Sequence, residues 1–73
     1  MPKAKIRNNL RKLRFEHGEM TQQALAEAAE CTRQTVIMLE HERYVPSLAL
    51  AFRIAEIFDR RVDDIFAYDG GSD

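Results

Sequence analysis

The sequence predicts a small all-α domain of five helices. Three observations carry this prediction: apolar residues recur at helical spacing along most of the chain, N-cap residues precede these stretches, and strand-like alternation is slight. A chain of 73 residues has the size of one domain. We expect that domain to span residues 1–68, followed by a loose tail over residues 69–73, because DGGSD favours irregular structure.

The basic N-terminal stretch predicts the first helix. Ile6, Leu10, Leu13 and His17 are spaced by four, three and four residues, so a helix would bring them onto one face. Gly18 follows directly and is typical of a helix end. We therefore expect a helix with one apolar stripe and a basic outer surface.

Two short helices follow, and both begin with the same local signals. One spans residues 21–30 and the other about residues 32–42, so the turn between them has three or four residues. The N-caps are Thr21 and Thr32, and the hydrophobic-staple pairs are Met20 with Leu25 and Cys31 with Val36. This arrangement predicts a helix–turn–helix unit.

The second helix of this unit has an unusual outer face. If Val36 and Leu39 face the core, steps of 100° turn the opposite side outward. That side carries Gln34, Ile37, Met38 and His41, with Arg33 on the flank. Arg and Gln hydrogen-bond base edges in the major groove of DNA, and apolar side chains contact thymine methyl groups. A rotated helix would bury Ile37 and Met38 instead, but it would expose Val36 and Leu39.

The fourth helix carries more apolar surface than a small core needs. Ser47 caps it over residues 47–60, and its wide apolar arc contains Leu48, Leu50, Ala51, Ile54, Ala55 and Phe58. A short fifth helix follows over residues 62–66, and segments 3–7 and 66–68 favour at most a two-stranded patch joining the termini. The surplus residues Phe52, Ile57, Phe66 and Tyr68 predict a homodimer interface; the alternative is that they belong to the core.

Composition excludes several classes of function. A single cysteine cannot form an internal disulfide, and no Cys/His set has zinc-site spacing, so we expect no metal or other cofactor. We interpret Cys31 as a small buried apolar residue, in preference to a redox switch. No Gly-rich phosphate loop or nucleophile constellation is evident, and so we expect neither an enzyme nor a small-molecule ligand. No apolar run approaches the roughly 20 residues of a membrane span, and we expect a cytoplasmic protein.

The net charge of −1 conceals an asymmetry along the chain. Residues 1–14 contain no acid and carry six of the eleven basic residues, namely Lys3, Lys5, Arg7, Arg11, Lys12 and Arg14. The rest of the chain holds five Arg against all twelve Asp and Glu. A polyanionic partner would therefore meet a basic N-terminal side, with the acidic fourth and fifth helices facing away.

Three segments together resemble the Cro/CI-type (Xre) helix–turn–helix regulators, and most closely their small stand-alone members. They are GEMTQQALAEAAECTRQTVIMLE, the pattern Y-x-P-S-L-x-L-A-F-x-I-A of the fourth helix, and DDIF near the end. The resemblance spans roughly residues 6–68. It implies a five-helix, lambda-repressor-like fold, binding to double-stranded DNA, and a homodimer on a palindromic operator, more often as a repressor.

The resemblance also implies roles for individual residues. It implies base contacts from Arg33, Gln34, Ile37 and Met38, phosphate contacts from Gln22, Thr32 and Thr35, with Arg43 near the backbone, and an ion pair between Arg14 and Glu40. The sequence departs from the family at the turn, where Glu30 and Cys31 replace the usual Gly and the hydrophobic residue after it. Glu30 is then expected in the left-handed conformation, which costs a non-Gly residue roughly 1 kcal/mol or more.

A second hypothesis belongs to a different class of function. Antitoxins of toxin–antitoxin pairs share this fold, so the surplus apolar surface would then bind a toxin in place of a second copy. Co-purification of a second polypeptide in stoichiometric amount would favour this protein-interaction module.

Overall fold

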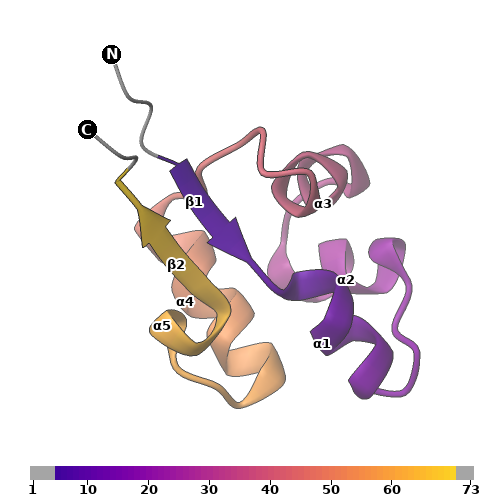
Figure 1. The fold of residues 1–73 in the computed structure, drawn as a ribbon. Helices are drawn as coiled ribbons and strands as arrows, with labels where there is room; N and C mark the ends of the chain where they lie inside the picture. The colour runs from indigo at the N-terminus through magenta and orange to yellow at the C-terminus, as the bar shows by residue number, and fades with distance from the viewer. Residues whose placement is uncertain (1–4, 71–73) are drawn as a thin grey trace.

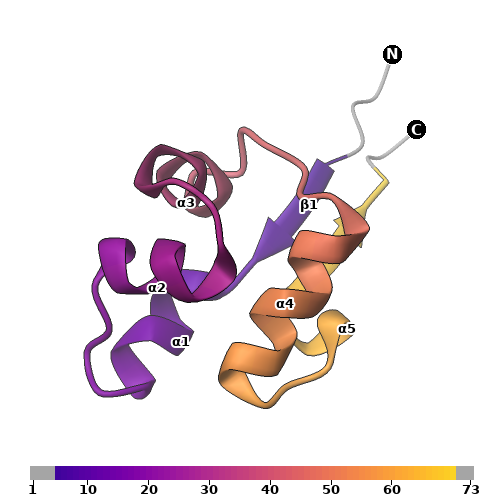
Figure 2. The same ribbon diagram turned by 180° about the vertical axis from the view of Figure 1, so that it is seen from behind.

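The computed structural model describes residues 5–70 and contains five helices and a two-stranded sheet, as the sequence predicted. In chain order the elements are β1 (Lys5–Asn8), α1 (Leu10–Glu16), α2 (Gln22–Ala29), α3 (Arg33–Glu40), α4 (Leu48–Phe58), α5 (Val62–Ile65) and β2 (Phe66–Asp69). Helices α1, α2 and α3 gather on one side, whereas α4 and α5 lie beside the sheet (Figure 1). Seen from behind, α4 covers the sheet and α3 stands apart from it (Figure 2).

The sheet joins the two ends of the described chain. β1 and β2 are antiparallel, and Ile6 pairs with Tyr68 while Asn8 pairs with Phe66. Two expectations are corrected here. Ile6 belongs to this strand and not to the first helix, which begins only at Leu10, because its backbone pairs with a strand some 60 residues away in sequence. The strand also includes Asp69, which we expected in the tail; residues 71–73 of that tail lie outside the described residues.

A single core is built from all five helices. Its fully buried side chains include Leu10 of α1, Leu25 of α2, Leu39 of α3 and Ile54 of α4. Val36 is 1% exposed and Leu39 is 0% exposed, so α3 has the predicted rotation.

The arc expected along α4 needs one correction. Leu48 is 70% exposed, although Leu50 and Ala51 in the same turn of α4 are buried, because Leu48 lies at the edge of the buried face, on the side of the exposed Phe52. No helix among residues 5–70 combines the length and apolar character that a bilayer crossing requires.

The ends of the helices follow the predicted local chemistry. The hydroxyl oxygens of Thr21, Thr32 and Ser47 accept hydrogen bonds from backbone N–H groups three residues on, at 2.9, 3.1 and 3.1 Å. Such caps satisfy backbone donors that the first helical turn leaves unpaired. Glu30 ends α2 at φ 59° and ψ 44°, the left-handed conformation expected for it, and Asp59 ends α4 in the same way.

Candidate nucleic-acid interface

The outward face of α3 combines exposed polar side chains with half-buried apolar ones. Arg33 and Gln34, in the first turn, are exposed, whereas Ile37 and Met38 are half-buried. A shallow hollow of about 410 Å³ lies on this face, lined by Gln34, Ile37, Met38, His41 and Arg43. Such a surface offers hydrogen-bonding groups around an apolar floor, which is the combination that base edges and thymine methyl groups require.

Two threonines shape the N-terminal end of α3. Thr32 is exposed and Thr35 is half-buried, and their hydroxyl oxygens lie 2.9 Å apart. The backbone N–H groups and the helix dipole at such an end favour an anion. Both threonines therefore lie at an end of α3 that suits an anion, beside the exposed Arg33.

A buried ion pair fixes α3 against α1. Arg14 Nε lies 2.5 Å from Glu40 Oε2, and Arg14 Nη2 donates to Glu40 Oε1 at 3.1 Å. The two side chains are only 11% and 7% exposed, so the charges pair in an environment with little water. Arg14 Nη1 also donates to the carbonyl oxygen of Met20 at 2.8 Å, in the connection between α1 and α2. Arg14 thus contacts both flanks of the helix–turn–helix unit.

Gln22, the first residue of α2, belongs to the same network. Its side-chain Nε2 donates to Glu40 Oε1 at 3.1 Å. Gln22, which we expected to contact a phosphate, is therefore held in place by the buried carboxylate of Glu40 in α3. Sequence reasoning assigned Gln22 and Glu40 separately and missed this link, because nothing in a spacing of 18 residues indicates it.

Asn8 is a second anchor of α3 that the sequence did not reveal. Its Nδ2 donates to the carbonyl oxygen of Leu39 at 2.7 Å, near the C-terminal end of α3. Its Oδ1 accepts from the backbone N–H of Leu10 at 3.1 Å, at the start of α1. Close by, Lys5 Nζ lies 3.5 Å from Glu42 Oε1. The N-terminal strand thereby ties the end of α3 to the rest of the molecule.

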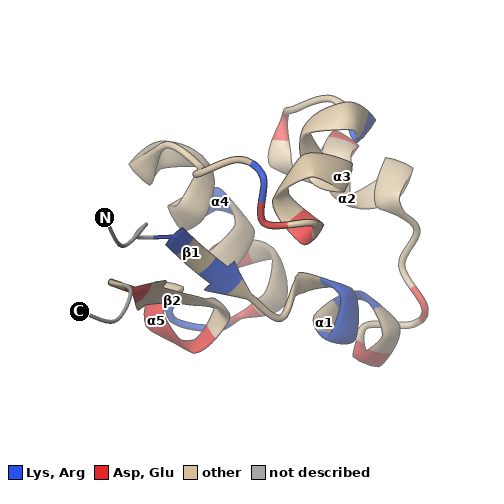
Figure 3. Ribbon diagram, turned by 45° about the horizontal axis from the view of Figure 1, so that its top comes forward, with Lys and Arg blue, Asp and Glu red and all other residues tan. Residues whose placement is uncertain are grey.

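Charge is distributed unevenly over the surface. Lys and Arg follow β1 and α1, whereas Asp and Glu predominate around α5 and β2 (Figure 3). Arg43, just beyond α3, is exposed and lies beside the outward hollow. The side with β1 and α1 therefore suits a polyanion better than the side with α5 and β2.

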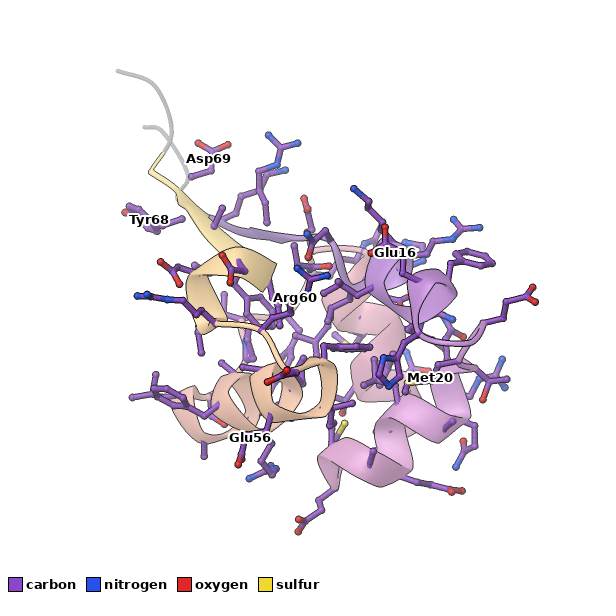
Figure 4. All side chains as sticks on the ribbon, turned by 90° about the horizontal axis from the view of Figure 1, so that it is seen from below. Glu16, Met20, Glu56, Arg60, Tyr68 and Asp69 are labelled. Carbon is purple, nitrogen blue, oxygen red and sulfur yellow. The ribbon has the colours of Figure 1, made fainter. Side chains whose placement is uncertain are left out.

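The four residues expected at a dimer interface differ in their exposure. Phe52 of α4 is 54% exposed and Tyr68 of β2 is 73% exposed, and Tyr68 points away from the body of the protein (Figure 4). Ile57 instead packs partly against the core, and Phe66 is only 8% exposed. Phe66 is thus occupied within its own chain, which leaves Phe52 and Tyr68 as the exposed members.

Cys31 lies in the turn between α2 and α3 and packs partly against the core. Burial raises the pKa of its thiol above the ordinary value of 9.0, and the nearby charge of Arg53 lowers it in part. A raised pKa keeps the thiol protonated and poorly nucleophilic near neutral pH. The environment of Cys31 therefore favours the structural interpretation over the redox switch.

Comparison with known proteins agrees with this geometry. Residues 10–65 match the family model described as helix-turn-helix, which covers α1 to α5. The chain belongs to the Cro/CI-type helix–turn–helix family of DNA-binding transcriptional regulators. Helices α2 and α3 are its helix–turn–helix unit, with Glu30 at the turn.

Relatives of this regulator occur in archaea and in bacteria. An uncharacterised HTH-type transcriptional regulator of Methanothermobacter thermautotrophicus is 49% identical over 65 residues, which cover 88% of this chain and 93% of that protein. One from Methanocaldococcus jannaschii is 42% identical, covering 88% and 96%. The regulator YgzD of Bacillus subtilis is 39% identical, covering 84% and 91%. The similarity therefore extends over nearly the full length of these small regulators.

Proposed function

We propose that this regulator is a homodimeric repressor that binds a palindromic operator, with α3 of each protomer in a major groove. The outward face of α3 carries the proposal: a helix that buries Val36 and Leu39 presents Arg33 and Gln34 beside the half-buried Ile37 and Met38. Occupation of an operator by the dimer would block transcription sterically.

Each residue of this face has a role in the proposal. Arg33 and Gln34 are exposed near the start of α3, from where a recognition helix contacts base edges. Arg hydrogen-bonds guanine with two donors, and Gln does so with adenine. Ile37 and Met38 line the floor of the hollow and would contact thymine methyl groups. Together they would supply the sequence specificity.

Phosphate contacts would fix the orientation of α3 in the groove. Gln22 and Thr32 lie at the starts of α2 and α3, Thr35 one turn further along, and Arg43 beyond the C-terminal end. These contacts are independent of sequence, and each phosphate that is neutralised lowers log K by about 0.9 per tenfold rise in salt.

The homodimer would form through an exposed apolar surface that we name the α4 surface. It comprises the exposed Val45, Leu48, Phe52 and Tyr68, together with the partly buried Ile6. Val45 is 62% exposed, and Leu48 and Phe52 are one helical turn apart on the same side of α4. A groove of about 230 Å³ runs between Ile6, Val45 and Leu48, where side chains of a second copy would fit. A symmetric dimer places two recognition helices about 34 Å apart, one turn of DNA.

Selection of bound duplexes from a random pool tests the proposal. The wild-type protein is expected to enrich a palindrome, and Arg33→Ala is expected to lose one symmetric position of it, at a cost of about 1–3 kcal/mol. The matched control is Arg60→Ala, because Arg60 is an exposed arginine in the connection between α4 and α5, which lies at the opposite end of the molecule from α3 (Figure 1). Enrichment of the same site by Arg33→Ala would refute the assignment of Arg33.

The exposed α4 surface also favours a second candidate, a protein-interaction module that binds another polypeptide. A toxin-like partner would then cover Leu48 and Phe52 in place of a second copy. Absence of any enriched duplex at low salt, together with a stoichiometric second polypeptide on purification, would support this candidate against the homodimeric repressor.

A further inference from the structure

A second hollow lies where α1, α2 and α3 meet, and only polar or charged residues line it. Its volume is about 360 Å³, and its lining residues are Arg11, Arg14, Gln22, Glu40 and His41. Arg11 and His41 have no part in the contacts assigned above. An all-polar hollow on a protein surface is suited to a charged ligand, and the sign of that ligand follows from which charges are already paired.

The negative charge in this hollow is compensated within the protein. Glu40 accepts hydrogen bonds from Arg14 and from Gln22, and its side chain is only 7% exposed. Arg11 is exposed, and its guanidinium carbon lies 6.0 Å from the centre of the Phe15 ring, on the outer side of α1. With Arg14 and Glu40 cancelling, Arg11 gives the hollow a positive charge that favours an anion.

Gln22 is oriented as a donor to such an anion. Its side-chain nitrogen carries two N–H groups, and the hydrogen bond to Glu40 engages one of them. The bond also fixes the orientation of the Gln22 amide group: a carboxylate only accepts hydrogen bonds, so the amide nitrogen must face Glu40. The second N–H group of Gln22 remains to donate to a ligand in the hollow.

His41 connects this hollow with the outward face of α3. His41 lines this polar hollow, together with Arg11 and Gln22. It also lines the hollow on the outward face of α3, together with Ile37 and Met38. An anion bound between Arg11 and His41 would thus lie directly beside the face assigned to DNA bases. A phosphodiester group of DNA carries the required charge, and DNA bound by that face would bring its backbone close to this hollow.

We propose that this hollow binds a backbone phosphate of DNA through Arg11, Gln22 and the positively charged form of His41, so that affinity for DNA rises as pH falls. The inference rests on the proposed function in taking DNA as the partner and Gln22 as a phosphate contact; it adds Arg11, His41 and the dependence on pH. Phosphate contacts are independent of base sequence, and so the pocket does not require that a particular operator exists.

The direction of the pH effect follows from the groups that face His41. The charged residues around its two hollows are Arg11, Arg14, Glu40 and Arg43, and the carboxylate of Glu40 is paired. Histidine gains its positive charge between about pH 8 and about pH 5. A phosphate favours that charged form, so the complex binds more protons than its free components do, and binding strengthens as pH falls.

Affinity for a duplex of random sequence, measured at low salt from about pH 8 to about pH 5.5, tests the role of His41. The wild-type affinity is expected to rise by about tenfold per protomer over this range, and His41→Gln is expected to remove the rise. The control is His17→Gln, because the chain has two histidines and the ring of His17 packs against Phe58, 5.5 Å between centroids. A flat wild-type profile, or an undiminished rise in His41→Gln, would overturn the inference.

The salt dependence of the same binding tests Arg11. Arg11→Ala is expected to reduce the slope of log K against log salt by about 0.9 per protomer, whereas Arg60→Ala is expected to leave it unchanged. An unchanged slope in Arg11→Ala would contradict the phosphate contact assigned to Arg11. Because the duplex is random in sequence, these results are independent of the selection experiment. If the protein enriches a palindrome but shows a flat pH profile, the proposed function is supported and the phosphate site in this hollow is contradicted.

Discussion

The outward faces of α3 and α4 differ in both chemistry and support. α3 presents Arg33 and Gln34 around a partly apolar floor, and polar contacts hold it to its neighbours in addition to its buried apolar residues. α4 exposes Leu48 and Phe52, and it rests on the core through apolar residues such as Ile54. A polar face on polar anchors suits a charged partner in water, whereas an apolar face suits a partner that removes it from water.

Under the proposed function, this difference would divide two tasks between two sides of one small domain. The α3 side would determine which DNA sequence is bound, and the α4 side would determine with what the protein associates. Mutations on one side should therefore leave the other task intact, provided that the fold survives.

The largest expected effect concerns the anchor of α3. Arg14→Met removes one partner of the buried ion pair and leaves the Glu40 carboxylate unpaired, so the free energy of unfolding should fall by about 3–5 kcal/mol. Urea unfolding measures it. The double variant Arg14→Met/Glu40→Leu should recover most of the loss, because no buried charge is left alone. A single variant as stable as the wild type would show that polar anchoring of α3 is unimportant.

The next effect concerns association through α4. Leu48→Asp should weaken the homodimer by at least about 2 kcal/mol, roughly thirtyfold in Kd, because it places a charge at the centre of the proposed interface. The monomer should remain folded, since Leu48 is 70% exposed. Sedimentation equilibrium measures the change. Phe15→Asp is the matched control, as Phe15 is 55% exposed but lies on α1; equal effects of the two variants would contradict the assignment of the α4 surface.

A smaller effect compares the ends of α2 and α4. Glu30→Gly should stabilise the protein by about 1 kcal/mol, because Glu30 has φ 59° and glycine adopts this conformation without a steric penalty. Asp59→Gly should stabilise the protein by less, since Asp tolerates the left-handed region better than Glu does. Thermal unfolding of both variants checks the order. A loss of stability in Glu30→Gly would mean that the Glu30 side chain has a stabilising contact.

The smallest effect concerns Cys31, in the turn between α2 and α3. Burial raises the pKa of its thiol in the folded state. As pH rises, the thiol therefore loses its proton in the unfolded chain before it does so in the folded protein. The protonated thiol thus favours the folded state. The stability contribution of Cys31 is therefore complete below pH 9.0 and is lost as pH rises above it. The difference in unfolding free energy between wild type and Cys31→Ala should shrink over that range. A difference that grows with pH would contradict the burial of the thiol.

Local signals predicted most of the α3 side. The caps at Thr21 and Thr32, the left-handed Glu30 and the rotation of α3 all follow from interactions within a few residues or from helical periodicity. The contacts of Asn8 with Leu39 and of Gln22 with Glu40 did not follow. They join residues 31 and 18 positions apart, which periodicity does not address.

The α4 side was harder to predict because some of its apolar residues fill the core and others are exposed at the surface. Periodicity placed Leu48 in the core arc, but it cannot tell how wide a part of that arc the rest of the protein covers. Ile6 fitted the helical stripe of Leu10 and Leu13, although pairing with Tyr68 places it in a strand. Phe66 was expected to be surplus, yet it completes the core. For Ile6 and Phe66 the strand pairing that decides their position is distant in sequence.

Binding of wild type and Leu48→Asp to an enriched palindrome and to its isolated half-site would test the separation of tasks most directly. We expect two wild-type protomers to bind the palindrome together, whereas Leu48→Asp binds it more weakly and one protomer at a time. On the half-site the two proteins should have the same affinity, because α3 is unchanged. Equal, cooperative binding of both proteins to the palindrome, or a loss of half-site affinity in a folded Leu48→Asp, would contradict the division between an α3 face for DNA and an α4 surface for association.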